Sequence, residues 1–474
     1  MQIFNTMTRK KEDFVPQEPG VYRIYVCGPT VYNYIHIGNA RPMIVFDTLR
    51  RYLEYLGNKV LYVSNITDID DKLIKKGQEN GTTMQEVARK FEAEYIKDSE
   101  GLNVKTPTVR PRATEHIGEI IKIVKDLVES GHAYVAHNGD VYFRVKSDPG
   151  YGKLSHLNLD DLESGNRELR SQMDDDLKED PADFAVWKAA KPGEPSWNSP
   201  WGQGRPGWHI ECSAMANKYL GKTIDIHSGG LDLIFPHHEN EIAQSECANG
   251  CTFAHYWLHN GFLTIDNEKM SKSKGNFFMV RDAAKQFGYE TIRMFMLSAH
   301  YRTPLNYSAE SLEMNKASLA RLYEARNNME FRIEKASGDT MTAEETEKLE
   351  ALKGYKQKFI DAMDDDLNTA DALSAIFELT REINAYNGSH QDATKAFLTA
   401  AHDLFMELTG VLNLVQNRDD AADPDAEKIE ELIAQRAAAK KEKNFAEADR
   451  IRGVLADMGV TIKDPRQGTQ WSRN

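Results

Sequence analysis

The sequence predicts an α/β fold for the first part of the chain, because strand-like and helix-like patterns alternate there. Val21 to Val26 is a β-branched and aromatic run closed by Gly28-Pro29, which is typical of a buried strand that ends in a turn. Apolar residues at helical spacing follow as far as Gly57, and a second strand pattern runs from Lys59 to Thr67. Strand, helix and strand in this order are typical of a parallel sheet.

Length and composition define the class of protein. The chain has 474 residues, enough for roughly three domains, with 41% hydrophobic and 28% charged residues, as in soluble globular proteins. No apolar run approaches the roughly 18 residues that span a bilayer, and the first residues lack the apolar core of a signal peptide, so we expect a cytoplasmic protein without a membrane partner. The net charge of −14 argues against a protein that coats nucleic acid indiscriminately, but it leaves room for a local basic patch.

The helix after the first strand opens with His36-Ile37-Gly38-Asn39. Pro42 fits the first turn of this helix, and Gly57 fits its C-terminal cap. In open α/β sheets ligands bind at this edge, and the positive end of a helix suits a phosphate group. A purely structural interpretation, in which His36 caps the helix and Gly38 serves a turn, remains open at this point.

An acidic cluster follows the second strand at Asp68, Asp70 and Asp71. Carboxylates in this arrangement can bind a divalent metal ion or cap the start of a helix. We favour the helix cap over the metal site.

A long polar stretch interrupts the α/β pattern. The residues from Ser147 to Gly207 are rich in Gly, Pro and acidic side chains, and a compact α/β domain rarely needs so long an irregular segment. We therefore predict an insertion at residues 119–202. Within it, Asn138-Gly139 lies between two β-rich runs and predicts a hairpin.

The remaining chain divides by composition. Helix-rich sequence resembling a bundle covers 316–416, and a linker separates it from a small C-terminal segment. The predicted organisation is the first half of the α/β domain at 1–118, the insertion at 119–202, the second half at 203–260, a region with a basic loop at 261–315, the helical bundle at 316–416, and the C-terminal domain at 427–474.

The four cysteines are too few and too scattered for a disulfide framework, which leaves metal binding or plain burial. Pro236 fits the first turn of a helix that carries His237 and Glu241 four residues apart, on one face. With Cys27 and Cys212 they form a set of two thiolates, an imidazole and a carboxylate, which suits zinc by ligand softness. Two alternatives stay open: a site built on Cys247 and Cys251, and no metal at all.

A basic loop follows the apolar run from Phe262 to Ile265. Lys269, Lys272 and Lys274 are interleaved there with serines and a glycine. A cationic loop of this kind suits the phosphates of a nucleotide, where charge builds on the leaving group. A solvated basic loop without such a function is the alternative interpretation.

Taken together, these motifs resemble a known family. HIGN (36–39) with KMSKS (269–273) is similar to the paired signatures of class I aminoacyl-tRNA synthetases. The resemblance to the cysteinyl-tRNA synthetase family covers nearly the whole chain through the motifs YVCGPTVY, NITDIDDK, PGWHIECSAM, FPHHENE and QGTQW. It implies a Rossmann-type catalytic domain. One departure is Asn39, where the family often has His; Asn can donate a hydrogen bond but carries no charge.

The resemblance implies a specific set of functional residues. In such enzymes one zinc ion, held by ligands matching Cys27, Cys212, His237 and Glu241, binds the thiolate of substrate cysteine and selects it over serine, so that no editing domain is required. The amino-acid pocket would contain Thr67, Trp208 and Asp232. The residues that bind ATP and take part in catalysis would be Thr30, His36, Gly38, Asn39, Lys269 and Lys272. Mg²⁺ would enter with the ATP.

The implied reaction is adenylation of L-cysteine by ATP and transfer of cysteine to the 3′-terminal adenosine of tRNA(Cys), carried out by a monomer. Residues 261–315 would contact the tRNA stem, and 427–474 would bind the anticodon, with Trp471 stacking on a base. Two other functions remain: a related ligase that joins cysteinyl-adenylate to an amino-sugar, and a zinc-stabilised RNA-binding protein without activity. The bundle and tail argue against the first, and the paired signatures argue against the second.

Overall fold

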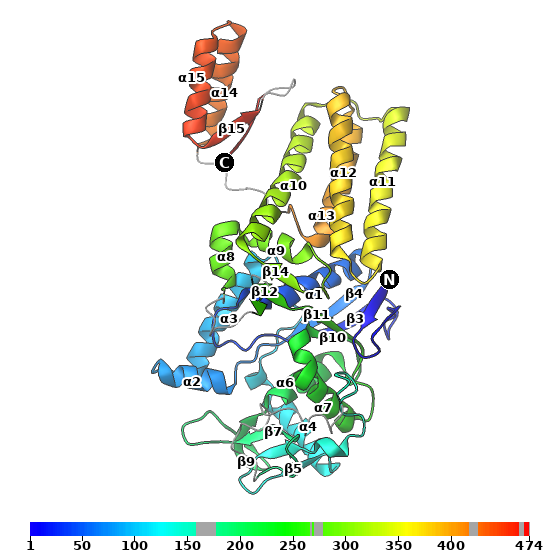
Figure 1. Cartoon of the computed structure of the whole chain (residues 1–474), viewed down its shortest axis with the longest axis vertical. Helices are drawn as coiled ribbons and strands as arrows, with labels where there is room; N and C mark the ends of the chain where they lie inside the picture. The colour runs from blue at the N-terminus through cyan, green and yellow to red at the C-terminus, as the bar shows by residue number, and fades with distance from the viewer. Residues whose placement is uncertain (158–176, 266–267, 270–277, 417–424, 464–468, 474) are drawn as a thin grey trace. The chain divides into compact units, whose positions relative to one another are not determined.

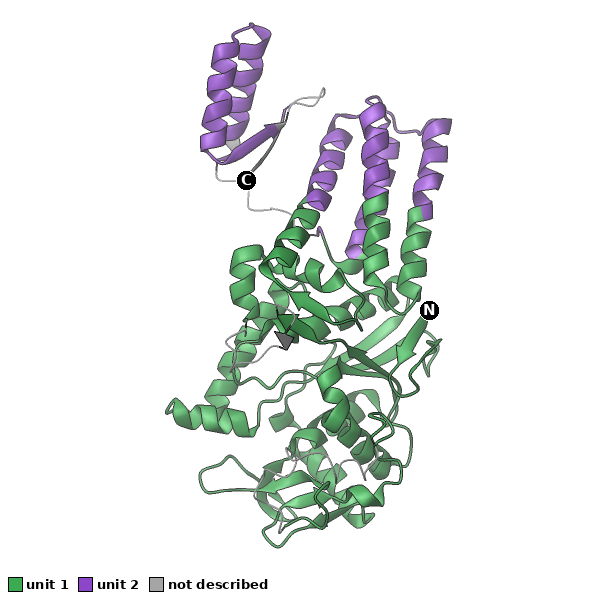
Figure 2. Ribbon diagram, in the orientation of Figure 1, with its two compact units in different colours: residues 1–320, 355–378, 411–414 green, residues 321–354, 379–410, 415–474 purple. Residues whose placement is uncertain are grey.

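The computed structural model describes residues 1–157, 177–265, 268–269, 278–416, 425–463 and 469–473 (Figure 1). They form two compact units, which comprise residues 1–320, 355–378 and 411–414 in the first and residues 321–354, 379–410 and 415–474 in the second (Figure 2). Within the described residues, no helix is both long enough and apolar enough to cross a membrane.

The first unit is built on a four-stranded parallel sheet with the strand order β11-β10-β3-β4, which confirms the predicted α/β class. Its strands are β3 (Val21–Val26), β4 (Lys59–Ser64), β10 (Ile224–Gly230) and β11 (Ala254–Asn260). The chain winds outward from β3 in one direction and from β10 in the other. The carboxyl ends of these two central strands therefore form a topological switch point, where open α/β sheets bind ligands.

Helices cover both faces of this sheet. Figure 1 shows α1 (Ile37–Tyr55) and α9 (Tyr289–Leu297) on one side, and α6 (Trp208–Leu220) and α7 (Glu239–Asn249) on the other. The strands are buried because both faces are covered, which explains their nearly continuous apolar sequence.

Helix α1 begins immediately after His36, and the side chain of Asn39 stabilises its start. Asn39 Oδ1 accepts a hydrogen bond from the backbone N–H of His36 at 3.0 Å. The prediction that Pro42 lies in the first turn is wrong, because the helix already begins at Ile37 and includes Pro42 in its second turn. Gly57 lies just beyond the helix end with a φ of +85°, so the predicted terminal glycine is confirmed.

The acidic cluster after β4 serves the fold, as predicted. Asp70 caps helix α2 (Asp71–Glu79), and its carboxylate accepts a hydrogen bond from the backbone N–H of Lys72 at 2.8 Å. Asp68 accepts a hydrogen bond from the backbone N–H of Thr114 at 3.0 Å. The first unit then continues with α3 (Met84–Gly101) and α4 (Ile117–Glu129).

Described residues between 133 and 206 form a separate antiparallel sheet, the insertion sheet, with the order β5-β6-β7-β9-β8. Its strands are β5 (Ala133–Val135), β6 (Val141–Phe143), β7 (Phe184–Ala189), β8 (Trp197–Ser199) and β9 (Gly202–Pro206). The predicted hairpin at Asn138-Gly139 is confirmed, since it joins β5 to β6 and Gly139 has a φ of +91°. One apolar core connects this sheet with α4 and with Ile210 and Ala214 of α6.

The remaining elements are mostly helical, as predicted. The first unit also contains the hairpin β1 (Gln2–Asn5) and β2 (Lys10–Asp13), the small sheet of β12 (Leu263–Ile265), β13 (Glu268–Lys269) and β14 (Leu305–Tyr307), and helix α8 (Val280–Phe287). Four long helices contribute residues to both units: α10 (Ala309–Lys335), α11 (Ala343–Asp364), α12 (Thr369–Ser389) and α13 (Lys395–Leu412). The second unit also contains α14 (Ala426–Lys441), α15 (Phe445–Asp457), β15 (Val460–Lys463) and β16 (Gln470–Arg473).

Candidate metal centre and substrate cavity

A cavity of about 520 Å³ opens at the carboxyl edge of the parallel sheet. Its wall comes from the turn after β3, the start of α1, and the residues that follow β10 and β11. Seven of the residues predicted to have a function line it: Cys27, Thr30, His36, Gly38, Asn39, Trp208 and Asp232. The switch point of the sheet therefore brings together segments that are up to about two hundred residues apart in the sequence.

Four other predicted residues are placed differently. Thr67 is buried, does not line the cavity, and donates a hydrogen bond from its hydroxyl to Glu211 Oε2 at 3.0 Å. Lys269 belongs to β13, and Lys272 lies outside the described residues. Trp471 belongs to β16, where its backbone pairs with that of Ile462.

The four predicted metal ligands, Cys27, Cys212, His237 and Glu241, lie together, with all ligand atoms within 4.8 Å of one another. The sulfur atoms of the two cysteines are 3.9 Å apart, and Glu241 Oε1 lies 2.9 Å from His237 Nε2. Cys27 Sγ is 3.5 Å from Glu241 Oε1, and Cys212 Sγ is 3.7 Å from His237 Nε2. The turn after β3, helix α6 and the start of α7 thus converge on one point.

The helical segment that carries His237 and Glu241 starts with a π-helical turn. Helix α7 begins at Glu239, and Pro236 lies in the preceding π-helical turn (Ile234–His238) after a cis peptide bond. Phe235 has an extended backbone and the backbone is helical from Pro236 into α7, so Pro236 lies in the first turn of the helical segment that carries His237 and Glu241, as predicted. His237 and Glu241 contact each other, because the turn leads directly into α7.

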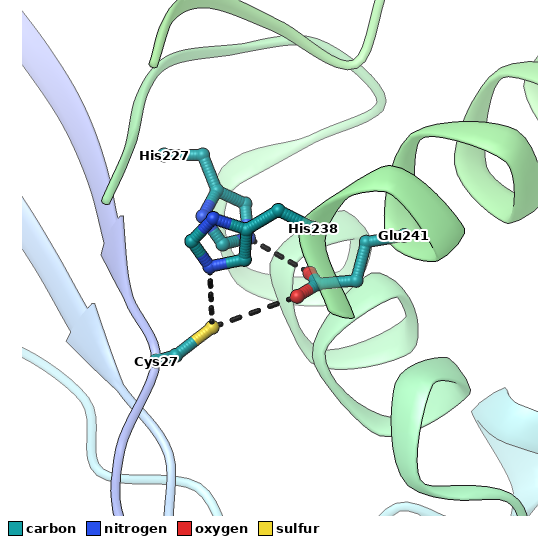
Figure 3. A group of neighbouring side chains, drawn as sticks. All are labelled: Cys27, His227, His238 and Glu241. Atoms are coloured by element: carbon teal, nitrogen blue, oxygen red, sulfur yellow. Dashed lines mark hydrogen bonds and ion pairs between the residues drawn. The ribbon is translucent and has the colours of Figure 1, made fainter. Parts of the chain in front are cut away.

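A second set of potential ligands, Cys27, His227, His238 and Glu241, overlaps the first (Figure 3). His227 Nε2 lies 2.8 Å from Glu241 Oε2, and His238 Nε2 lies 3.3 Å from Cys27 Sγ. The sequence interpretation missed both histidines as neighbours of the centre. The adjacency of His238 to His237, and the position of His227 two residues before Gly229, were the available signals.

The protonation of the cluster reflects its burial and its mutual contacts. A hydrogen bond from Cys27 lowers the pKa of the Cys212 thiol to about 6, and burial raises the pKa of Cys27 well above its usual value. Burial opposes the charge on His237, but the carboxylate of Glu241 outweighs this and raises the pKa of His237 to about 10. Burial also opposes the charge on Glu241, but His227 and His237 lower its pKa to about 2. The contacts within the cluster thus favour the deprotonated forms of Cys212 and Glu241, which are the forms that bind a cation.

The donor chemistry and the surrounding contacts fit a divalent metal ion. His209 Nδ1 lies 2.9 Å from His237 Nδ1, which leaves His237 Nε2 directed at the cluster. His227 contacts the second oxygen of Glu241, so that the first oxygen is directed at the thiols. Partners of this kind orient the ligands of protein metal sites.

The alternative site at Cys247 and Cys251 finds no support among the described residues. Neither cysteine belongs to a group of potential ligands there. Cys251 Sγ instead lies 3.6 Å from the hydroxyl of Thr223, and Cys247 packs against the apolar core of the insertion sheet.

Trp208 and Asp232 both border the cavity, and Trp208 also contacts the metal centre. The Trp208 ring lies 4.3 Å from the His237 ring and is 42% exposed, which leaves part of the indole available to a ligand. Asp232 follows β10 and lines the same cavity. An aromatic face and a carboxylate next to a thiol-rich centre suit a small amino acid with an ammonium group.

Comparisons with known proteins agree with this arrangement. Residues 13–317 match the model of the tRNA synthetases class I (C) catalytic domain, residues 358–416 match the DALR domain, and residues 424–471 match the cysteinyl-tRNA ligase anticodon binding domain.

Relatives and solved structures extend the comparison. The cysteine–tRNA ligase of Clostridioides difficile (strain 630) is 54% identical over 475 residues, with full coverage of both chains, and that of Lachnospira eligens is 52% identical over 477 residues, again with full coverage. Among solved structures, methionyl-tRNA synthetase of Mycobacterium tuberculosis with methionyl-adenylate has a TM-score of 0.62 at 16% identity, over 87% of this chain and 94% of that chain. The last likeness shows a shared fold. The chain belongs to the class I aminoacyl-tRNA synthetases and, within them, to the cysteine–tRNA ligase family.

Proposed function

We propose that this chain activates L-cysteine with ATP, releases pyrophosphate, and transfers the cysteine to the 3′-terminal adenosine of tRNA(Cys). The observation that carries the proposal is the thiol-rich centre beside the substrate cavity, in a chain that is similar over its full length to cysteine–tRNA ligases. Mg²⁺ accompanies the ATP, and the chain acts as a monomer.

Zinc is the metal that this centre suits best, held by Cys27, Cys212, His237 and Glu241. The set uses both thiols, which zinc prefers, and leaves His227 and His238 as outer partners. When bound, the ion supplies a soft contact for the thiolate of the substrate. Serine offers a hydroxyl instead, and a shaped pocket alone discriminates poorly between two such similar side chains.

The start of α1 suits the phosphates of ATP. Asn39 uses its side-chain oxygen to hold the backbone of His36, so its amide N–H₂ group remains able to donate to a phosphate oxygen. His36 and Gly38 line the cavity at the positive end of this helix, with Thr30 nearby. Lys269 and Lys272 of the basic loop would stabilise the departing pyrophosphate.

The amino group and carboxylate of cysteine require polar partners next to the metal centre. Trp208 and Asp232 line the cavity there and suit the ammonium group. Thr67 remains the predicted contact for the amino acid, although its hydroxyl is bonded to Glu211 in this structure. The tRNA would bind through residues 261–315 at its stem and through 427–474 at its anticodon, where Trp471 stacks on a base.

Cysteine-dependent exchange of pyrophosphate into ATP, followed by charging of tRNA(Cys), tests the proposal. The expected result is exchange with cysteine and not with serine, and cysteine recovered on tRNA. Exchange without tRNA charging, but with cysteine transfer to an amino-sugar, would instead identify the related ligase. Absence of cysteine-dependent exchange would reject both enzymatic functions.

A further inference from the structure

Arg110 lines the substrate cavity and has no acceptor for its guanidinium group among the residues that the structure describes. Its Nε atom is buried without a hydrogen-bond partner, and the group lies 5.7 Å from the centre of the Tyr95 ring. A buried donor that bonds to nothing destabilises a protein, because it has lost its hydration. A ligand with acceptor oxygens would remove this penalty.

The fold places Arg110 at the ligand-binding edge of the sheet. Residues 109–112 run beside β4 in parallel, with bridges from Val63 to Val109 and from Ile66 to Arg112. This register sets Arg110 next to Ser64, which lines the cavity. Ser64 is in turn the register partner of Val26 on the neighbouring strand β3. Arg110 therefore extends the row of residues that borders the cavity from β3 through β4.

The aromatic ring behind Arg110 is itself held in position. Tyr95 is buried in α3, and its backbone carbonyl accepts a hydrogen bond from the Ser99 hydroxyl at 2.8 Å. A guanidinium group that stacks on a fixed ring loses less conformational freedom when it binds a ligand. The guanidinium group of Arg110 is thus preorganised for binding a ligand in the cavity.

Two other arginines, Arg112 and Arg41, have the protein contacts that are typical of a structural role. Arg112, two residues further on, forms ion pairs with Glu92 and Glu115, both at 2.8 Å. Arg41, which is fully buried, donates to the backbone carbonyl groups of Gly261 and Phe262. Arg110 has no such contact within the described residues.

The charge of the cavity favours an anionic ligand. Among the described residues that line it, Lys72 and Arg110 are the only lysine or arginine, and Asp232 is the only carboxylate. Lys72 contacts the face of the Tyr32 ring at 5.4 Å and forms no ion pair with a described residue. Two cations that form no ion pair with a described carboxylate suit a ligand with more than one negative charge.

We propose that Arg110 binds the terminal phosphates of ATP, beyond the phosphate that cysteine attacks. The inference rests on the proposed function, which brings ATP to this cavity. Arg110 shares the cavity with the start of α1, where the nucleotide phosphates are expected, and its fork of donors matches two phosphate oxygens at once. Its partial burial favours the phosphates of a small ligand over the backbone of an RNA.

Arg110→Ala, Arg110→Lys and Arg112→Ala, assayed by cysteine-dependent ATP–pyrophosphate exchange, test this inference. Loss of a charge-assisted contact predicts that Arg110→Ala raises the KM values for ATP and pyrophosphate by about tenfold to a hundredfold, with the KM for cysteine nearly unchanged. Arg110→Lys should recover part of the loss, because it keeps the charge without the fork. Arg112→Ala should lower the melting temperature without changing the KM for ATP. Inhibition by AMP, which lacks the terminal phosphates, should be the same in Arg110→Ala and the unmodified enzyme.

Unchanged KM values for ATP and pyrophosphate in Arg110→Ala would overturn the inference, as would a rise confined to the KM for tRNA. Equal weakening of AMP and ATP would also overturn it, because the contact would then not be to the terminal phosphates. If Arg110→Ala does not fold, the same comparisons with Arg110→Lys decide the question. The unmodified enzyme distinguishes failure of the proposed function from failure of this inference. If the unmodified enzyme shows no cysteine-dependent exchange, the proposed function is contradicted. If it shows normal exchange and the Arg110 variant is unaffected, only this inference is contradicted.

Discussion

Replacement of His227 by Ala distinguishes the two overlapping ligand sets of the metal centre. In the proposed set His227 is an outer partner that contacts Glu241 Oε2 at 2.8 Å, whereas in the alternative set of Figure 3 it is itself a ligand. Removing an outer partner typically weakens metal binding by about tenfold to a hundredfold, or about 1.4–2.8 kcal/mol. The protein should therefore retain zinc at micromolar metal and lose it earlier in competition with a chelator.

Replacement of a true ligand should have a larger effect. Structural zinc sites bind with about 10–16 kcal/mol, so an equal share for each of four ligands is about 2.5–4 kcal/mol, or roughly a hundredfold to a thousandfold in affinity. Cys212→Ser should thus lose zinc at chelator concentrations that His227→Ala still withstands. Cysteine activation should fall in step with zinc content, and discrimination against serine should fall with it.

The assay is a zinc titration against a coloured chelator, combined with metal analysis and exchange assays on the same samples. His227→Gln is a matched control, because its amide can still donate a hydrogen bond to Glu241. Cys247→Ser is a second control, since this cysteine lies outside both sets and should keep zinc and activity. Zinc retained by Cys212→Ser but lost from His227→Ala and His238→Ala would refute the proposed set in favour of the alternative.

Three further predictions concern other parts of the chain. Lys272→Ala should lower adenylation by more than about tenfold in kcat with cysteine binding nearly unchanged, because its contact strengthens in the transition state; an equal loss of cysteine affinity would contradict this. Trp471→Ala should raise the KM for tRNA in charging assays and leave pyrophosphate exchange intact, and impaired exchange would reject that division of labour. Asp47→Asn should lower the free energy of unfolding by about 3–5 kcal/mol, because the buried Asp47 carboxylate accepts a hydrogen bond from the buried Arg293 at 2.6 Å. Although burial opposes it, the charge of Arg293 lowers the pKa of Asp47, so this stability is present at neutral pH and is lost in acid; a denaturant series should show the difference between the two proteins shrinking as the pH falls through the lowered pKa.

Local patterns were sufficient for much of the fold. The strand at Val21–Val26 and the hairpin at Asn138-Gly139 could be predicted because their signals depend on residues close together in the sequence. The helix cap at Asp70 was predictable for the same reason. The position of Pro42 was mispredicted, since the actual start of α1 depends on a hydrogen bond from His36 to the side chain of Asn39. Competing cap positions within a few residues have similar local signals, and the tertiary structure selects among them.

For the candidate site, the sequence by itself determined which residue types were available and, through its resemblance to a family, which four ligands to expect. Only the tertiary structure decided that Cys27 and Cys212 meet at 3.9 Å, because that contact requires α6 to pack against β3, although the strands of the insertion sheet separate the two in the sequence. It also brought His227 to Glu241 and left Arg110 facing the cavity without a protein acceptor. Spacing along the chain contains no information on such contacts, since parallel strands bring their carboxyl ends together from distant parts of the sequence.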